Sequence, residues 1–215
     1  MARGCGAEDV TGCAILILAA GASSRMRGGD KLLEGVAGQP LLRLMALRAL
    51  AVAKGTVLCT LPGPAHPRSA CLDRLAVTPV FVANACEGMG ASIRAGIGAL
   101  PADCPAVMIL PADMPELTAD DLTTMLLAHQ TAPAAILRAV DRDGTTGHPV
   151  IFPADLFPAL ATCRGDTGAR DVLRQHQGRV ILVSLPDRHA TTDLDTPEDW
   201  AAWRRRSERK NRFEE

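Results

Sequence analysis

Short apolar runs alternate along the chain with longer segments that have a helical pattern of apolar and polar positions. The apolar runs predict strands at 14–19, 56–61, 77–82, 106–110, 134–140, 148–152 and 180–185. The segments between and after them predict helices at 40–53, 88–100, 117–130, 166–176 and 196–210. Strands that read as almost continuously apolar are buried on both faces. The pattern therefore predicts an α/β fold, a doubly wound and mainly parallel sheet with helices on both faces.

The whole chain, 1–215, is predicted to form one domain, because no repeat, low-complexity stretch or linker interrupts the pattern. The Pro-rich stretch "TLPGPAHPR" (60–68) is interpreted as a loop and not as a domain boundary. In a doubly wound fold, ligands bind beyond the carboxyl ends of the strands. Side chains that follow the predicted strands are therefore the first place to look for chemistry.

Composition and charge narrow the function classes. Hydrophobic residues make up 47% of the chain, enough for a substantial core, and the formal net charge is -1. A nearly neutral chain gives no electrostatic reason to expect binding to nucleic acid or to a membrane. The cationic tail "WRRRSERKNRFEE" lacks interleaved aromatics and is interpreted as a solvated helix. The seven cysteines form no C-x-x-C pair, which indicates reduced thiols, and with no apolar leader a cytoplasmic location is expected.

The stretch "LAAGASSRMRGGDKLL" (18–33) follows the first predicted strand and is unusually rich in glycines, hydroxyls and cations. Glycines let a backbone approach a phosphate closely, and Arg25 and Lys31 supply positive charge for a polyphosphate. The loop matches neither the Walker pattern nor the dinucleotide G-x-G-x-x-G pattern. On the residues alone, a polyphosphate cradle and a solvated Gly-rich turn explain it about equally well.

The same stretch resembles the L-A-A-G-x-S-x-R-M-G…K signature of the nucleotidyltransferases of molybdenum-cofactor maturation, in particular the CTP:molybdopterin cytidylyltransferases. Further segments resemble that family in the same order along the chain. They are "NACEGMGASIRAGI" (84–97), "LPADMP" (110–115), "GHPVIFPADLFPAL", "RGDTGARDVL" and "TDLDTPEDW" (192–200). One departure is Arg27, which stands where the family usually has glycine and is expected to point to solvent.

The resemblance implies a nucleotide site in the part of the chain up to about residue 115. The implied nucleotide-binding residues are Leu18, Ala19, Ala20, Gly21, Ser23, Ser24, Arg25, Lys31, Asn84, Gly88, Ser92 and Asp113. Of these, Arg25, Lys31 and Asp113 are the implied catalytic residues. For Ser92, a hydrogen-bonded helix serine is an equally good interpretation.

The resemblance also implies Mg²⁺ as cofactor, held by Asp113 and Asp195. Mg²⁺ prefers oxygen ligands and needs only one or two carboxylates, since it keeps several waters. Each aspartate has an alternative interpretation as a helix cap: Asp113 would cap the helix near Thr118, and Asp195 or Thr196 would cap the helix that begins near Pro197. Asp193 remains a rival to Asp195 as the second ligand.

The later part of the chain is expected to hold the second substrate. The residues implied for this acceptor site are His148, Gly165, Asp166, Gly168 and Arg170. Without the resemblance, His148 would be interpreted as a strand-edge histidine bonded to the backbone.

The implied reaction is transfer of CMP from CTP to molybdopterin with release of pyrophosphate. Ala20, where the guanylyl branch tends to carry glycine, favours CTP over GTP because its methyl group takes space near the base. The expected partners are CTP, molybdopterin and a molybdoenzyme or its chaperone that receives the product. Three alternatives stay open: guanylyl transfer, transfer to another phosphorylated small molecule, and a carrier that binds molybdopterin or nucleotide without turnover.

Overall fold

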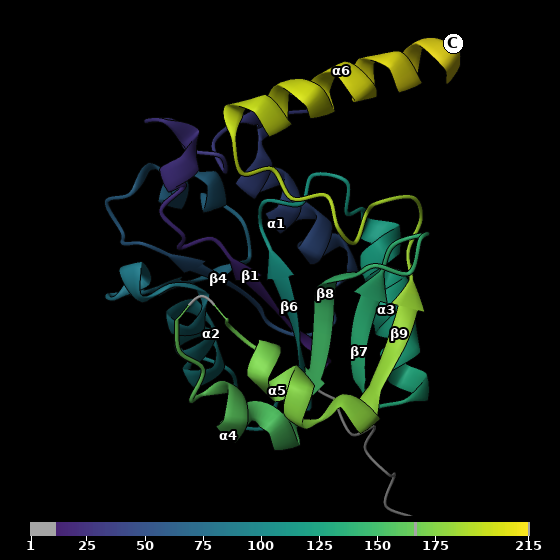
Figure 1. Ribbon diagram of the computed structural model, residues 1–215. Helices are drawn as coiled ribbons and strands as arrows, with labels where there is room; N and C mark the ends of the chain where they lie inside the picture. The colour runs from purple at the N-terminus through teal and green to yellow at the C-terminus, as the bar shows by residue number, and fades with distance from the viewer. Residues whose placement is uncertain (1–11, 166, 215) are drawn as a thin grey trace, which may run out of the picture.

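The computed structural model describes residues 12–165 and 167–214, with side chains to residue 208. A seven-stranded sheet in the order β5-β4-β1-β6-β8-β7-β9 forms its centre (Figure 1). The strands are β1 Ala14–Leu18, β4 Val57–Leu61, β5 Thr78–Phe81, β6 Ala106–Pro111, β7 Ile136–Val140, β8 Thr146–Pro153 and β9 Val180–Ser184. Each strand begins and ends within two residues of its predicted boundaries. The prediction of a mainly parallel α/β sheet is confirmed.

Only β8 runs against its neighbours, antiparallel to both β6 and β7. The turn between β7 and β8 contains Gly144 at φ +81°, where the N–H of Gly144 donates to the carbonyl of Asp141. Ile109 of β6 lies opposite Val150 of β8, so His148 lies beside the end of β6. The reversal therefore brings the first residues of β8 to the edge where the parallel strands have their carboxyl ends.

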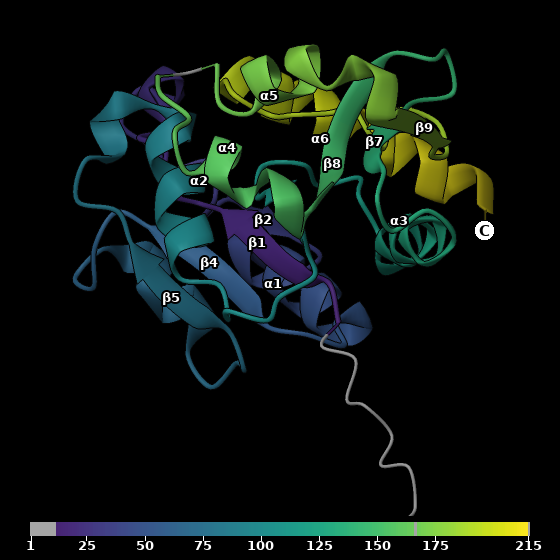
Figure 2. The same ribbon diagram turned by 90° about the horizontal axis from the view of Figure 1, so that it is seen from below.

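Helices cover both faces of the sheet (Figure 2). On one face lie α1 (Leu41–Val52) and α3 (Ala119–Thr131), and on the other lie α2 (Met89–Gly98), α4 (Phe157–Leu160) and α5 (Arg170–Gln175). Side chains of β1 alternate between the two cores: Ile15 and Ile17 pack towards α1 and α3, and Leu16 packs towards α2. This alternation explains why the strand reads as continuously apolar in the sequence.

The start of α3 is closed by Thr118 and Asp121, and not by Asp113. Thr118 accepts from the N–H of Asp121, whose carboxylate accepts from the N–H of Thr118, which completes a capping box. The last helix, α6 (Pro197–Glu214), extends past the end of the sheet in Figure 1. The predicted helix 166–176 is shorter in the structure, because α5 begins only at Arg170.

Several short elements were not predicted. A two-stranded hairpin joins β2 (Gly35–Val36) to β3 (Gln39–Pro40), and α4 precedes the 164–170 loop. The 3₁₀ helices are η1 Ser24–Met26, η2 Pro67–Leu72, η3 Ala85–Glu87, η4 Ala154–Leu156 and η5 Gln177–Arg179. Such elements of three to six residues are too short to produce a hydrophobic period.

No helix in the described part of the chain is long and apolar enough to cross a membrane. The cysteines at 13, 59, 71, 86, 104 and 163 are free thiols, as the sequence predicts. Burial raises the pKa of the Cys13 and Cys59 thiols to about 12, so these two behave as core side chains.

Candidate active site

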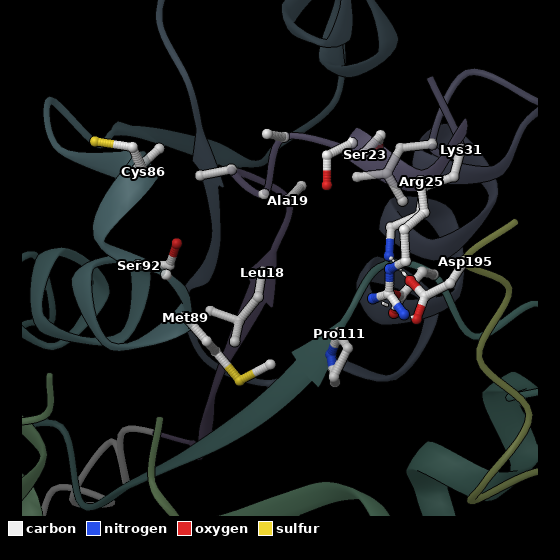
Figure 3. A pocket seen from close by; sticks show the side chains of 18 residues that line it. Leu18, Ala19, Ser23, Arg25, Lys31, Cys86, Met89, Ser92, Pro111 and Asp195 are labelled. Carbon is white, nitrogen blue, oxygen red and sulfur yellow. Dashed lines mark hydrogen bonds and ion pairs between the residues drawn. The ribbon is translucent and has the colours of Figure 1, made fainter. Parts of the chain in front are cut away.

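A cavity of about 430 Å³ opens at the carboxyl ends of β1 and β6 (Figure 3). Its walls come from the loop after β1, the start of α2 with the preceding η3, and the end of β6. Of the predicted nucleotide and metal residues, it brings together Leu18, Ala19, Ala20, Gly21, Ser23, Ser24, Arg25, Lys31, Gly88, Ser92, Asp113 and Asp195. Residues from four distant parts of the sequence thus share one concave site.

Asn84 is the predicted nucleotide residue that does not line this cavity. It precedes η3, is exposed, and its carbonyl accepts from the N–H of Glu87 at 3.0 Å. The structure therefore gives Asn84 a turn-forming position. Cys86 and Met89, from the same segment, do line the cavity. They were missed because no chemical pattern distinguishes them in the sequence.

A charge cluster closes one end of the cavity. The Lys31 Nζ lies 2.5 Å from Asp113 Oδ2 and 2.6 Å from Asp195 Oδ1, and Arg25 Nη2 lies 2.7 Å from Asp195 Oδ2. Figure 3 shows Lys31 and Arg25 converging on Asp195. Burial alone would lower the pKa of Lys31, but the carboxylates of Asp113 and Asp195 outweigh it and raise that pKa. The ammonium therefore stays charged and bridges the two carboxylates.

Asp195 reaches this position because the segment after β9 is fastened along its length. Leu194 N–H donates to the carbonyl of Asp113 at 3.2 Å, and the Thr192 hydroxyl donates to Glu116 at 2.8 Å. Thr196 caps α6, since its hydroxyl accepts from the N–H of Asp199 at 3.1 Å. The capping role that the sequence left open between Asp195 and Thr196 thus falls to Thr196, and the Asp195 carboxylate is directed to Lys31 and Arg25.

Asp113 and Asp195 are also the two oxygen donors that a divalent ion would need at this end of the cavity. Among the residues that the structure describes, no cluster of three or more His, Cys, Asp or Glu forms a metal site. Two carboxylates suit Mg²⁺ or Mn²⁺ when phosphate oxygens and waters complete the coordination. Asp193 lies outside the lining, and burial together with the Asp113 and Asp195 carboxylates raises its pKa.

Arg27 points away from the cavity, as the sequence predicts. Its guanidinium pairs with Glu198 at 2.8 Å in the first turn of α6, and both side chains are more than 60% exposed. Its φ of +52° lies in the left-handed region, which glycine adopts at a lower cost than arginine.

A second, smaller cavity of about 160 Å³ lies beside the first, and Met89 lines both. His148 and Arg170 of the predicted acceptor site line it, together with Arg138 of β7, which the sequence analysis missed. Burial lowers the pKa of His148 to about 4, so its ring is neutral at neutral pH. Its Nδ1 is buried and has no hydrogen-bond partner within the described chain.

The other predicted acceptor residues are dispersed. Gly168 is buried against Met89, whose Sδ would lie 3.0 Å from an added Cβ. Gly165 lines a separate surface depression near Glu87 and Arg94, and its carbonyl accepts from Gly90 N–H at 2.9 Å. Asp166 lies outside the described residues. The loop therefore closes over the start of α2, and only part of it borders the second cavity.

Comparison with known proteins is consistent with this geometry. The model of the MobA-like NTP transferase domain matches residues 15–180. The chain belongs to this family of nucleotidyltransferases. A curated relative, nicotine blue oxidoreductase of Paenarthrobacter nicotinovorans, is 31% identical over 188 residues, which is 85% of this chain and 92% of that protein.

Solved structures share the fold at lower identity. Rv0371c of Mycobacterium tuberculosis H37Rv superimposes with a TM-score of 0.74 at 23% identity, covering 90% of this chain and 98% of that one. The same protein has also been solved as a complex with manganese. The CMP:2-keto-3-deoxy-manno-octonic acid synthetase complexed with CTP has a TM-score of 0.72 at 15% identity, covering 93% of this chain and all of that one.

Proposed function

We propose that this chain transfers CMP from CTP to molybdopterin and releases pyrophosphate. The observation that carries the proposal is the cluster in which Lys31 bridges Asp113 and Asp195 beside Arg25, at the end of a cavity lined by a Gly-rich loop. A polyphosphate needs cations, and its reacting phosphorus needs a divalent ion held by carboxylates. The cavity offers both within one contiguous surface.

In this proposal Arg25 and Lys31 bind the β- and γ-phosphates and stabilise the charge that develops on the departing pyrophosphate. A phosphate oxygen of the acceptor forms the new bond to the α-phosphorus, and the bond from that phosphorus to the bridging oxygen breaks. The proposed cofactor is Mg²⁺, held by Asp113 and Asp195; when bound, it would neutralise charge on the phosphates during transfer. The manganese complex of the M. tuberculosis relative supports a divalent ion.

The preference for CTP rests on the space around Ala20. Its side chain is 2% exposed and belongs to a small apolar cluster with Val82 and Ala91 at the cavity wall. We infer that this methyl group limits how far a base can enter between the first loop and α2. A pyrimidine ring fits such a space more easily than a purine. A synthetase of the same fold has been solved with CTP bound.

The second cavity is the proposed acceptor site. Arg138 and Arg170 line it, and neither guanidinium has a carboxylate partner among the described residues; the Arg138 Nε donates to the Gly147 carbonyl at 3.5 Å. Burial and the positive charge of Arg170 lower the pKa of Arg138, so an anionic ligand would relieve an unfavourable like-charge contact. Met89, which lines both cavities, marks the boundary between the proposed nucleotide part and the proposed acceptor part.

The direct test incubates the pure protein with Mg²⁺, molybdopterin and each nucleoside triphosphate in turn, with mass analysis of the product. We expect the cytidine dinucleotide of molybdopterin and stoichiometric pyrophosphate from CTP. Turnover with GTP alone, or equal turnover with all four triphosphates, contradicts the base assignment. Pyrophosphate release with another phosphorylated acceptor, but not with molybdopterin, moves the proposal to that acceptor.

Asp113→Asn separates an enzyme from a carrier that binds molybdopterin or nucleotide without turnover. We expect pyrophosphate release to fall by at least a hundredfold, because the variant has one metal-binding carboxylate fewer. Unchanged release would remove Asp113 from the chemistry. A wild-type protein that binds both ligands and releases no pyrophosphate with any acceptor would instead be a carrier.

A second candidate function is a redox reaction, favoured by the 31% identity to a relative named as an oxidoreductase. The described cysteines form no disulfide, and the end of the first cavity with Lys31 and Asp113 is charged. The test replaces the triphosphate and molybdopterin by a reduced nicotinamide dinucleotide as hydride donor and nicotine blue, the compound in the relative's name, as the acceptor of that hydride. Oxidation of that dinucleotide without pyrophosphate chemistry would favour the redox function.

A further inference from the structure

One arginine is completely buried beneath the loop of the first cavity. Arg68, in η2, is 1% exposed, although a charged side chain is rarely buried to this extent unless it is fully paired. All of its five N–H groups have acceptors. Nε donates to Asp30 Oδ2 at 2.8 Å, Nη1 to the carbonyls of Ala19 and Gly21 at 2.6 and 2.7 Å, and Nη2 to Ser23 Oγ and Asp30 Oδ1, both at 2.8 Å.

The acceptors all belong to the loop, at its beginning and near its end. Ala19, Gly21 and Ser23 come directly after β1, and Asp30 directly precedes Lys31. Asp30 also accepts from the N–H of Leu32 at 3.0 Å. Burial opposes the charge of Asp30, but the hydrogen bonds from Arg68 and Leu32 outweigh it and lower the pKa of this carboxyl. The guanidinium is therefore neutralised locally, and its charge is not directed at a ligand.

The two carbonyl contacts have a consequence for the opposite side of the loop. In a planar trans peptide the C=O and the following N–H point in opposite directions. With the carbonyls of Ala19 and Gly21 turned to Arg68, the N–H groups of Ala20 and Ala22 are turned away from it. Within the described chain, no N–H of residues 20–25 donates a hydrogen bond. Ala20, Gly21 and Ala22 all line the first cavity, so these donors are available to a ligand there.

Unpaired N–H groups in successive residues make an anion-binding concavity. This conformation is not the relaxed one, since Ser23 has a φ of +50° and Arg27 a φ of +52°. Non-glycine residues in the left-handed region cost free energy and persist only where surrounding contacts impose them. Arg68 supplies five such contacts from outside the cavity.

We propose that Arg68 is the positioning residue of the triphosphate loop: by holding the Ala19 and Gly21 carbonyls and Asp30, it aims the Ala20 and Ala22 N–H groups at the polyphosphate. Arg68 does not touch the substrate. The inference rests on the proposed nucleotide site and adds a residue from a Pro-rich segment to which the sequence assigned only a loop.

The test compares Arg68→Lys with Arg43→Lys as a matched control. Arg43, on α1, donates to the carbonyls of Cys71 and Asp73 at 3.0 and 3.3 Å, and so contacts the end of η2 without touching the loop. Inorganic tripolyphosphate and CTP are titrated by calorimetry, and steady-state kinetics are measured with CTP. For Arg68→Lys we expect Kd and KM to rise at least tenfold while kcat falls much less, because a lysine cannot satisfy five acceptors.

For Arg43→Lys we expect Kd and KM within twofold of wild type. Equal Kd values for Arg68→Lys and wild type would overturn the inference and leave the proposed function standing. If wild type binds neither tripolyphosphate nor any triphosphate, both fail together. Asp30→Asn serves where Arg68→Lys does not fold: it removes the counter-ion that orients the guanidinium, and a folded Asp30→Asn protein with unchanged Kd equally overturns the inference.

Discussion

Replacing Lys31 by Met should strengthen the binding of a divalent ion in the absence of nucleotide. The ammonium of Lys31 occupies the position between Asp113 and Asp195, at 2.5 and 2.6 Å, that the ion would need. Lys31, Arg25 and the two carboxylates together carry no net charge, so free protein has little attraction for a cation. Methionine has a similar length and no charge, and leaves the cluster with a net charge of -1.

The magnitude follows from Coulomb's law. A unit positive charge about 5 Å from a divalent ion raises its energy by about 1.7 kcal/mol at the dielectric constant of water, and by more in a partly buried site. The three side chains are only 15–19% exposed, so the value for water is a lower limit. Since about 1.4 kcal/mol corresponds to a factor of ten, Lys31→Met should bind Mn²⁺ at least ten times more tightly than wild type.

The assay is a Mn²⁺ titration without nucleotide, followed by the electron paramagnetic resonance signal of the free ion. Arg27→Met is the matched control: it removes a cation of the same loop that pairs with Glu198 away from the cavity, and should leave the affinity unchanged. CTP affinity should change in the opposite direction, because Lys31→Met loses a phosphate contact. Mn²⁺ affinities that are equal in wild type and Lys31→Met would refute the idea that lysine and metal compete for the same carboxylates.

Two further predictions concern stability. In α2, Gly96→Ala should lower the free energy of unfolding by about 1–3 kcal/mol, because the added Cβ would lie 2.3 Å from a Leu16 methyl group. Gly98→Ala should raise the free energy of unfolding by about 0.5–1 kcal/mol, since no atom lies within 4 Å of its added Cβ. Chemical denaturation measures both values, and equal effects would contradict the packing described. Burial lowers the pKa of His148 from 6.5 to about 4 in the folded protein. As the pH drops from 6.5 to 4, the imidazole is therefore protonated first in the unfolded chain, and the free energy of unfolding falls. His148→Gln should therefore reduce the loss of stability between pH 7 and 4 by up to about 3 kcal/mol. Urea unfolding of wild type and of His148→Gln at several pH values measures this, and the same pH dependence in the two proteins would contradict the prediction.

The position of the strands was predictable because burial on both faces gives the same continuous apolar run whatever the partners are. The direction of β8 was not read from these runs, although "DG" at 143–144, between two apolar runs, is a hairpin signal that would have revealed it. The short hairpin at residues 35–40 was missed as well. Its turn consists of Ala37 and Gly38, both at positive φ, and alanine gives no hint of that conformation.

The first cavity brings together most of the residues that the motifs indicated, and the second cavity includes one that no motif indicated. Asp113 and Asp195 were identified from resemblance, and the structure brings them to one lysine. Asn84 was assigned to the nucleotide site from its place in the same kind of motif, yet it does not line the cavity. Arg138 was missed because one arginine in an apolar strand gives no sign of the cavity beside it. Its significance depends on Arg170, which is distant in sequence.

By itself, the sequence determined the strands, the long helices and the Gly-rich loop that contains Arg25 and Lys31, since each depends on residues that are neighbours along the chain. Only the tertiary structure decided that Lys31 bridges Asp113 and Asp195, and that Arg68 holds the loop from beneath. These are contacts between residues up to 164 positions apart. Hydrophobic period and local propensity carry no information about which distant side chains meet, because that is fixed only when the strands have taken their order and direction in the sheet.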